Sequence, residues 1–171
     1  MCPEKRRVIV WPDPILEQSA KPVDHGERAL VASTLAELHS WMISTGSSAL
    51  AANQLGIPLR IIALRCPQAG TGNPPKFIDL INPEITKKSG QDRTEETCLS
   101  LPGAQLGITR FERIQVTALT STFDQMTFVA SGRFARAIQH SVDHLDGIMM
   151  IDRCSRLLAK TVLRNIHMFT D

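Results

Sequence analysis

The sequence has few of the features that mark nucleic-acid-binding, membrane-spanning or disulfide-stabilised proteins. Its 19 basic residues nearly balance its 17 acidic residues, and no basic run is long enough to follow a phosphate backbone. No apolar stretch approaches the roughly 20 residues of a membrane span, and the N-terminus has no apolar signal core. The four cysteines form no C-x-x-C pair, so we expect reduced thiols. These absences predict a cytoplasmic protein that binds neither nucleic acid nor membrane.

What the sequence does have is enough apolar material for a core. With 171 residues, 43% of them hydrophobic, the chain can bury a sizeable interior. No internal repeat, low-complexity tract or linker divides it. We therefore expect one domain spanning residues 1–171.

The apolar periodicity changes along the chain. Apolar residues at helical spacing predict a helix from about Gly26 to Thr45, and a second helix from Gly132 to Gly147. Apolar runs and alternation between them predict strands, with a Pro/Gly-rich loop at 67–75; the candidate strands are 58–64, 77–82, 114–118 and 126–130. A modest amphipathic stretch, Leu157 to Ile166, ends the chain. Strands that precede a late helix indicate an α+β fold.

The late helix carries two histidines, His140 and His144, four residues apart. This spacing places both imidazoles on one helix face, where they can bind one divalent metal. In the H-E-x-x-H motif of metal hydrolases, the residue after the first histidine is a glutamate that takes a proton from the activated water. Here that residue is Ser141. The metal-binding half of the motif is present and the base is missing.

A histidine pair alone also occurs by chance, as two ordinary surface or core residues. Two further features favour a site. Cys98, in the segment Glu96-Thr97-Cys98-Leu99-Ser100, offers a third ligand, and one cysteine with two histidines leaves a position open for water or substrate. Gln54 ends a run of small residues that would let backbone and ligand approach closely.

Over nearly its full length, the chain resembles the peptide deformylases, which remove the N-formyl group from nascent polypeptides. The motifs that carry the resemblance are Pro12-Asp13-Pro14, the small-residue run ending in Gln54, Glu96 to Ser100, and Gln139-His140 to Gly147. The resemblance implies mainly antiparallel sheets packed around a late metal-binding helix. It implies one divalent metal on Cys98, His140 and His144, commonly Fe²⁺ and replaceable by Zn²⁺, Ni²⁺ or Co²⁺.

The resemblance also assigns functions to residues around the metal. Gln54 and the backbone N–H of Leu99 would stabilise the oxyanion formed when water attacks a carbonyl. Glu96 would pair with Arg110 and hold the motif loop. Ser48 and Ala49, in the small-residue run, are candidate substrate-binding residues.

The chain departs from the family pattern at specific positions. Ser47, Ala49 and Thr97 stand where the family has glycines, and these changes concern the walls of the cleft. Ser141 stands at the position of the catalytic glutamate. A serine hydroxyl is too short and does not titrate near neutrality, and losing such a base costs about 10²–10⁴ in rate. An introduced inactivating substitution is the alternative, which the other departures disfavour.

Arg133 and Arg136 form a second kind of departure. They precede His140 by seven and four residues, so both project within roughly 40° of the first metal ligand. In the family these positions are apolar and line the pocket for methionine. The alternative is a solvated helix edge. Because guanidinium groups bind carboxylate and phosphate bidentately, we interpret both arginines as substrate-binding residues for an anionic group.

The sequence supports three hypotheses for the function. The first, which the sequence favours, is a deformylase-like metalloenzyme of altered chemistry that acts on a small anionic N-formyl or amide-type compound. The second is an authentic but slow peptide deformylase, and the third is a homologue that binds metal and ligand without turnover. The expected partner is a small molecule or a short peptide. The sequence leaves ribosome association open.

Overall fold

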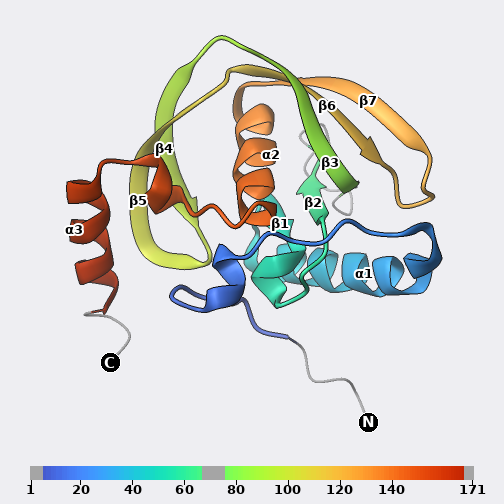
Figure 1. Ribbon diagram of the computed structural model, residues 1–171, viewed down its shortest axis with the longest axis horizontal. Coiled ribbons are helices and arrows are strands. Elements are labelled where there is room, and N and C mark those ends of the chain that lie inside the picture. The colour runs from blue at the N-terminus through green and yellow to red at the C-terminus, as the bar shows by residue number, and fades with distance from the viewer. Residues whose placement is uncertain (1–5, 67–75, 168–171) are drawn as a thin grey trace.

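The computed structural model describes residues 6–66 and 76–167 and arranges them as two antiparallel sheets around a central helix (Figure 1). The α-helices of this part of the chain are α1 (Arg28–Thr45), α2 (Gly132–Leu145) and α3 (Arg156–His167). Short 3-10 helices lie between the larger elements: η1 (Pro14–Glu17), η2 (His25–Glu27), η3 (Ala52–Leu55) and η4 (Met150–Arg153). The expected α+β fold class is confirmed.

The larger sheet has the strand order β1-β2-β3-β6-β7, and all neighbouring strands are antiparallel. Its strands are β1 (Ala49–Ala51), β2 (Ile61–Arg65), β3 (Phe77–Ser89), β6 (Arg113–Leu119) and β7 (Gln125–Ser131). The smaller sheet is a hairpin of β4 (Asp92–Cys98) and β5 (Leu101–Arg110). In Figure 1 the hairpin passes on one side of α2, and β3, β6 and β7 pass on the other.

Strand β2 lies between two helices, which explains its unbroken apolar sequence. Ile61 and Ala63 belong to a core cluster with residues of α1, whereas Ile62 and Leu64 belong to a second cluster with residues of α2. Side chains alternate between the two faces of a strand, so a strand covered on both faces needs apolar residues throughout. Strand β2 thus packs against α1 on one face and against α2 on the other.

Helix α2 ends where the sequence predicts. Gly147 has a φ of 72°, and a Cβ at this position would lie 2.6 Å from the carbonyl oxygen of Glu17. Only glycine avoids both the left-handed strain and the collision with the η1 backbone. The helix that carries the histidine pair is therefore stopped by a close approach to the N-terminal segment.

The other predicted elements are present with shifted bounds. The strand expected over 58–64 begins at Ile61, because the preceding residues pair with Lys21, whose N–H donates to the Pro58 carbonyl oxygen at 2.8 Å. Strand β3 continues past the expected end at Asn82 to Ser89, with register shifts against β6 after Ile81. The loop expected at 67–75 lies outside the described residues.

The first helix, α1, confirms the helix expected to end near Thr45 and Gly46. Gly46 has a φ of 71° and ends the helix in the left-handed conformation. Leu35, Leu38 and Met42 are buried, whereas Leu30 is 45% exposed. Leu30 precedes Val31 by one residue and so points about 100° away from the buried stripe.

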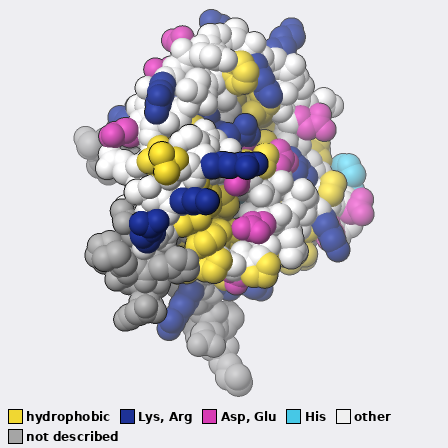
Figure 2. Space-filling model, turned by 60° about the vertical axis from the view of Figure 1, so that its left-hand side comes forward, with side chains coloured by type: hydrophobic (Ala, Val, Ile, Leu, Met, Phe, Trp, Pro, Cys, Tyr) yellow, Lys and Arg dark blue, Asp and Glu magenta, His cyan; other side chains and the backbone are white. Residues whose placement is uncertain are grey.

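The surface agrees with the mixed charge of the sequence. On the face shown in Figure 2, Lys and Arg side chains lie interspersed with Asp and Glu side chains. Among the described residues, no helix combines the length and the apolar character needed to cross a membrane.

Candidate metal centre

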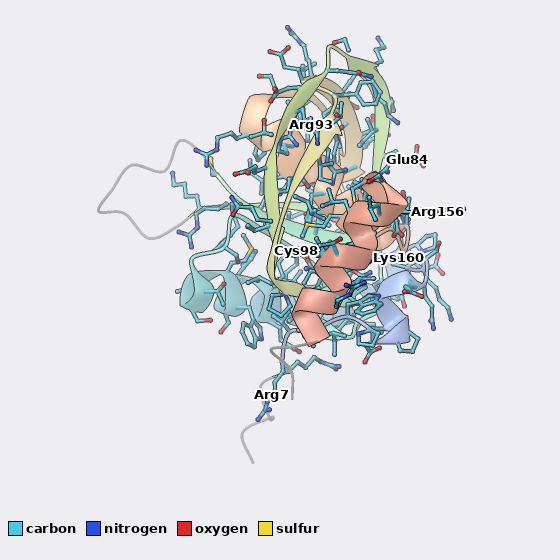
Figure 3. All side chains as sticks on the ribbon, turned by 90° about the vertical axis from the view of Figure 1, so that its left-hand side faces the viewer. Arg7, Glu84, Arg93, Cys98, Arg156 and Lys160 are labelled. Atoms are coloured by element: carbon cyan, nitrogen blue, oxygen red, sulfur yellow. The ribbon has the colours of Figure 1, made fainter. Side chains whose placement is uncertain are left out.

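Three potential metal ligands meet between the β4–β5 hairpin and α2. Cys98 ends β4, and His140 and His144 lie one turn apart on α2. Their ligand atoms all lie within 4.8 Å of one another, and Cys98 Sγ is 3.1 Å from His144 Nε2. Figure 3 shows Cys98 well separated from Arg93, which lies toward the start of the same strand. The structure thus brings together the residues that the sequence predicted as metal ligands.

The donor set suits a mononuclear metal site. A thiolate and two imidazoles are ligands that bind Zn²⁺ and other first-row divalent metals, and a fourth position stays open. In a tetrahedral site with such ligands, donor atoms lie about 3.5 Å apart. Cys98 Sγ and His144 Nε2 lie 3.1 Å apart, and no two ligand atoms of the three residues are more than 4.8 Å apart, so the donors are close enough for one ion to bridge. The residues present therefore fit one divalent metal ion.

His140 is oriented by a buried carboxylate. Glu96 lies two residues before Cys98 on β4, and its Oε2 is 3.1 Å from His140 Nδ1. This contact leaves Nε2 of His140 to face the cysteine. Carboxylates that accept a hydrogen bond from a metal-binding histidine fix its orientation and increase its basicity. Glu96 thus holds the His140 ring through its Nδ1 atom.

Arginines hold Glu96 in turn. Arg110 donates from Nε and Nη2 to the two carboxylate oxygens at 2.8 and 2.9 Å, which confirms the expected Glu96–Arg110 pair. Arg136 Nη1 donates to Glu96 Oε1 at 2.8 Å. Burial raises the pKa of Glu96, but hydrogen bonds from Arg110 and His140 outweigh it and hold the pKa well below its usual range. Glu96 is therefore a permanent anion at neutral pH.

His144 has different surroundings. Its side chain is buried, and its Nδ1 has no hydrogen-bond partner among the described residues. Its backbone carbonyl accepts a short hydrogen bond from the Asn53 side-chain amide. The ring of His144 meets that of His140 edge-on, with centroids 4.8 Å apart. Packing and backbone contacts, rather than a carboxylate, hold this histidine.

Proximity changes the protonation of the metal-free ligands. Burial raises the pKa of the Cys98 thiol, but hydrogen bonds from His140 and His144 outweigh it and lower the pKa to about 5. Burial lowers the pKa of His140, but its contacts with Cys98 and Glu96 outweigh this and raise the pKa to about 9. Cys98 is a thiolate at neutral pH, which is the form that binds metals.

Gln54 lies beside the cysteine at the end of η3. Its Nε2 is 3.7 Å from Cys98 Sγ and 3.1 Å from Ser100 Oγ, and its Oε1 accepts the Ala51 backbone N–H at 3.0 Å. The bond from Ala51 turns the carbonyl end of the amide away from the ligands. An N–H donor therefore points toward the candidate metal site.

Ser141 and Asp143 project from α2 in directions different from that of His140. Ser141 is buried directly after His140 and carries a neutral hydroxyl. Asp143 forms a very short ion pair with Arg110 and a second pair with Arg153, whose Nε donates at 3.1 Å. Asp143 is thus paired with two arginines and holds structure.

The remaining predicted site residues lie on several elements. Leu99 lies in the turn between β4 and β5, with its side chain 38% exposed. The Ser48 carbonyl accepts from the Arg65 N–H at 2.8 Å, and Ala49 begins β1. Arg133 is exposed in the first turn of α2. Arg136 donates hydrogen bonds to the Glu96 carboxylate and to backbone carbonyls of the hairpin. Because these acceptors occupy its guanidinium, the structure does not support the expected contact of Arg136 with a substrate anion.

The glycine replacements cause no backbone strain. Among the described residues, the non-glycine residues with a positive φ are Asn82 and Phe123. Ser47, Ala49 and Thr97 therefore have ordinary backbone conformations, and none of their side chains is fully buried. These residues therefore differ from glycine only by the side-chain atoms that they add.

Sequence reasoning missed the contact between Glu96 and His140. A signal was present, because residues two apart on a strand project to the same face, and Glu96 and Cys98 are two apart on β4. It also missed the bonds from Arg136 to the hairpin. No local pattern indicates them, since they depend on how β4 and β5 pack against α2.

Comparison with known proteins agrees with this geometry. The family model of polypeptide deformylase matches residues 5–160 of the chain. The chain belongs to the peptide deformylase family. The peptide deformylase of Acidobacterium capsulatum is 35% identical over 162 residues, which cover 95% of this chain and 94% of the relative.

Solved deformylase structures share the fold. The peptide deformylase of Legionella pneumophila superposes with a TM-score of 0.88 at 28% identity, covering 97% of this chain and 95% of its own. A class I type b peptide deformylase from Acinetobacter baumannii, with Met-Ala-Ser bound, gives a TM-score of 0.79 at 29% identity and covers 88% and 99%. As a peptide deformylase family member, the chain belongs to a family of metal-dependent hydrolases, and its Cys/His/His cluster could hold one metal ion.

Proposed function

We propose that this chain is a slow N-formyl hydrolase that uses one divalent metal bound by Cys98, His140 and His144. The observation that supports this proposal best is the meeting of these side chains within 4.8 Å, with the Gln54 amide beside them. The names of its relatives support deformylation. On family resemblance we further propose Fe²⁺ as the native metal and the cytoplasm, where formylated nascent chains arise, as the location.

The protein side chains would share the chemistry as follows. A bound metal would supply Lewis acidity, which polarises a carbonyl and lowers the pKa of water. The Gln54 Nε2 group and the backbone N–H of Leu99 would donate hydrogen bonds to the formyl oxygen as it becomes an oxyanion. Because the Ala51 N–H holds Gln54 Oε1, the Gln54 donor is already oriented and costs little reorganisation.

Proton transfer is the part of the reaction that these side chains support least. The leaving amine must receive a proton, and Ser141 cannot supply it at neutral pH. Glu96 and Asp143 are unsuitable replacements, because both are bound to arginines. Proton transfer is then left to solvent or to the substrate itself, and we expect a rate about 10²–10⁴ below that of a site with a positioned base.

Restoring the carboxylate tests this proposal. Ser141→Glu should raise kcat/KM for a formyl-Met peptide by about 10²–10⁴, whereas Ser141→Gln, which has similar size and no titratable group, should not. The measurement is release of formate by the metal-loaded proteins. Equal activity of the two variants would mean that the missing base does not limit this chain.

A small anionic formyl compound is the second candidate substrate, and the exposed position of Arg133 near the start of α2 favours it. The decisive comparison is kcat/KM for formyl-Met-Ala-Ser against formylated acidic amino acids. Arg133→Leu should lower only the second value if the arginine binds the anion. Activity on the formyl-Met peptide alone would eliminate this candidate.

The third candidate, a homologue that binds without turnover, is favoured by the buried Ser141. It predicts a metal-loaded protein that releases no formate from either substrate class. Under this candidate Ser141→Glu would create activity instead of increasing it. The wild-type rate above the uncatalysed background therefore separates it from the main proposal.

A further inference from the structure

Arg136 binds the β4–β5 hairpin at several points. From α2, its Nη1 donates to Glu96 Oε1 and to the Ile108 carbonyl oxygen, both at 2.8 Å. Its Nη2 donates to the Asp92 carbonyl oxygen at 2.9 Å and reaches Asp92 Oδ2 at 3.5 Å. The Arg136 side chain is only 13% exposed. One guanidinium therefore joins the histidine helix to both strands of the hairpin that presents the cysteine.

The carboxylate of Glu96 contacts four nitrogen atoms. Its Oε1 accepts from Arg110 Nε and Arg136 Nη1, and its Oε2 contacts Arg110 Nη2 and His140 Nδ1. Two oxygens with four donors have little freedom to rotate. Arg136 thereby supports the oxygen opposite the one that contacts His140.

The metal ligands come from the same two elements that Arg136 connects. Cys98 belongs to β4, whereas His140 and His144 belong to α2. The distance between thiolate and imidazoles thus depends on how closely the hairpin packs against the helix. A buried charged hydrogen bond between these elements is strong and directional.

We propose that Arg136 is a positioning residue of the metal centre, which holds Glu96 against His140 and the β4–β5 hairpin against α2. This inference rests on the proposed metal site and goes beyond it. It gives Arg136 a function different from the anion binding expected from the sequence. Loss of outer-shell partners of metal ligands costs about 10–100-fold in affinity, and because Arg110 still holds Glu96 we expect about a tenfold loss here.

Cobalt binding tests the inference without measuring catalysis. Co²⁺ is titrated into metal-free wild type, Arg136→Gln, Arg136→Lys and Arg93→Gln in competition with a chelator, and the absorption spectrum is recorded. Arg93 is exposed and one residue from Asp92, on the opposite face of β4 from Glu96, so Arg93→Gln is the matched control. Thermal unfolding of each metal-free protein is measured in parallel.

The expected result is about tenfold weaker Co²⁺ binding and shifted absorption bands for Arg136→Gln, partial recovery for Arg136→Lys, and no change for Arg93→Gln. Wild-type affinity and spectrum in Arg136→Gln, even with a lower Tm, would overturn the inference and leave Arg136 a packing residue. If that variant does not fold, Arg136→Lys decides, and unchanged affinity overturns the inference. A wild type that binds no Co²⁺ through Cys98 would instead contradict the proposed function and remove the inference with it.

Discussion

The two histidines of the candidate metal centre lie one turn apart on the same helix, but different interactions hold their side chains in place. His140 is 17% exposed in its side chain, and a charged network of Glu96, Arg110 and Arg136 holds it from behind. His144 is buried, its Nδ1 has no partner among the described residues, and Asn53 bonds only its backbone. One ligand therefore depends on electrostatics and the other on packing.

This difference shows where the site is sensitive. A carboxylate that orients His140 can be removed without opening a large cavity, so its loss should appear mainly in metal affinity. A buried contact near His144 supports the end of α2, so its loss should appear mainly in the free energy of unfolding. Single substitutions can separate these two effects.

The largest effect should come from the residue that both histidines contact. Cys98→Ser removes the thiolate ligand. Loss of a residue that only supports a ligand costs about 10–100-fold in metal affinity, and we expect the Co²⁺ affinity of Cys98→Ser to fall by more than this. The thiolate absorption of the cobalt protein should disappear as well. Cys154→Ser, a cysteine outside the cluster, is the control. Retention of the thiolate absorption in Cys98→Ser would show that another residue binds the metal.

The same cysteine predicts a pH dependence in the metal-free protein. The pKa of Cys98 falls from 9.0 to about 5 on folding, so its contribution to stability is full above pH 9 and is lost as pH falls through about 5. Ultraviolet thiolate absorbance should decrease with a midpoint near pH 5, and Cys98→Ser should lack this step. A midpoint near 9 would mean that the histidines do not stabilise the thiolate.

Removing the charge behind His140 should have a smaller effect. Glu96→Gln keeps the shape of the side chain but leaves an amide against His140 and two arginines. Co²⁺ affinity should fall by about 10–100-fold, measured by chelator competition. Glu95→Gln, on the exposed face of the same strand, should leave the affinity unchanged. An equal loss in both variants would contradict the electrostatic account of His140.

The smallest effect on metal binding should come from the surroundings of His144. Asn53→Ala leaves the carbonyl oxygen of His144 without its donor, which should cost about 1–2 kcal/mol in the free energy of unfolding. Denaturant titration measures this loss. The Co²⁺ affinity should change less than in Glu96→Gln. A greater loss of affinity in Asn53→Ala would reverse the comparison between the two histidines.

Much of the centre could be predicted from local patterns. The four-residue spacing of His140 and His144 implies a shared helix face, because the helical period depends only on the backbone. Gly147 marks the end of that helix for an equally local reason, since it needs a positive φ. Residue type made Cys98 a candidate third ligand, the resemblance to deformylases assigned it to the metal and supplied the Glu96–Arg110 pair, and the structure brings both into place.

Arg136 shows where local patterns stop being sufficient. Its helix position correctly predicts that it lies on the side of His140, but a long side chain can reach acceptors in several directions. The acceptors that it binds are the Glu96 carboxylate and the backbone carbonyls of Asp92 and Ile108, all on the hairpin. Which acceptor a guanidinium binds depends on the packing of distant segments.

By itself, the sequence determined the α+β class, the histidine helix, the types of the metal ligands and the loss of the base at Ser141. These properties follow from residue chemistry and from the short periods of helices and strands. Only the tertiary structure decided that Glu96 orients His140, that His144 relies on burial, and that Arg136 joins helix to hairpin. Those contacts join residues 28 to 91 positions apart, and they form only because the folded core excludes water from the groups that pair.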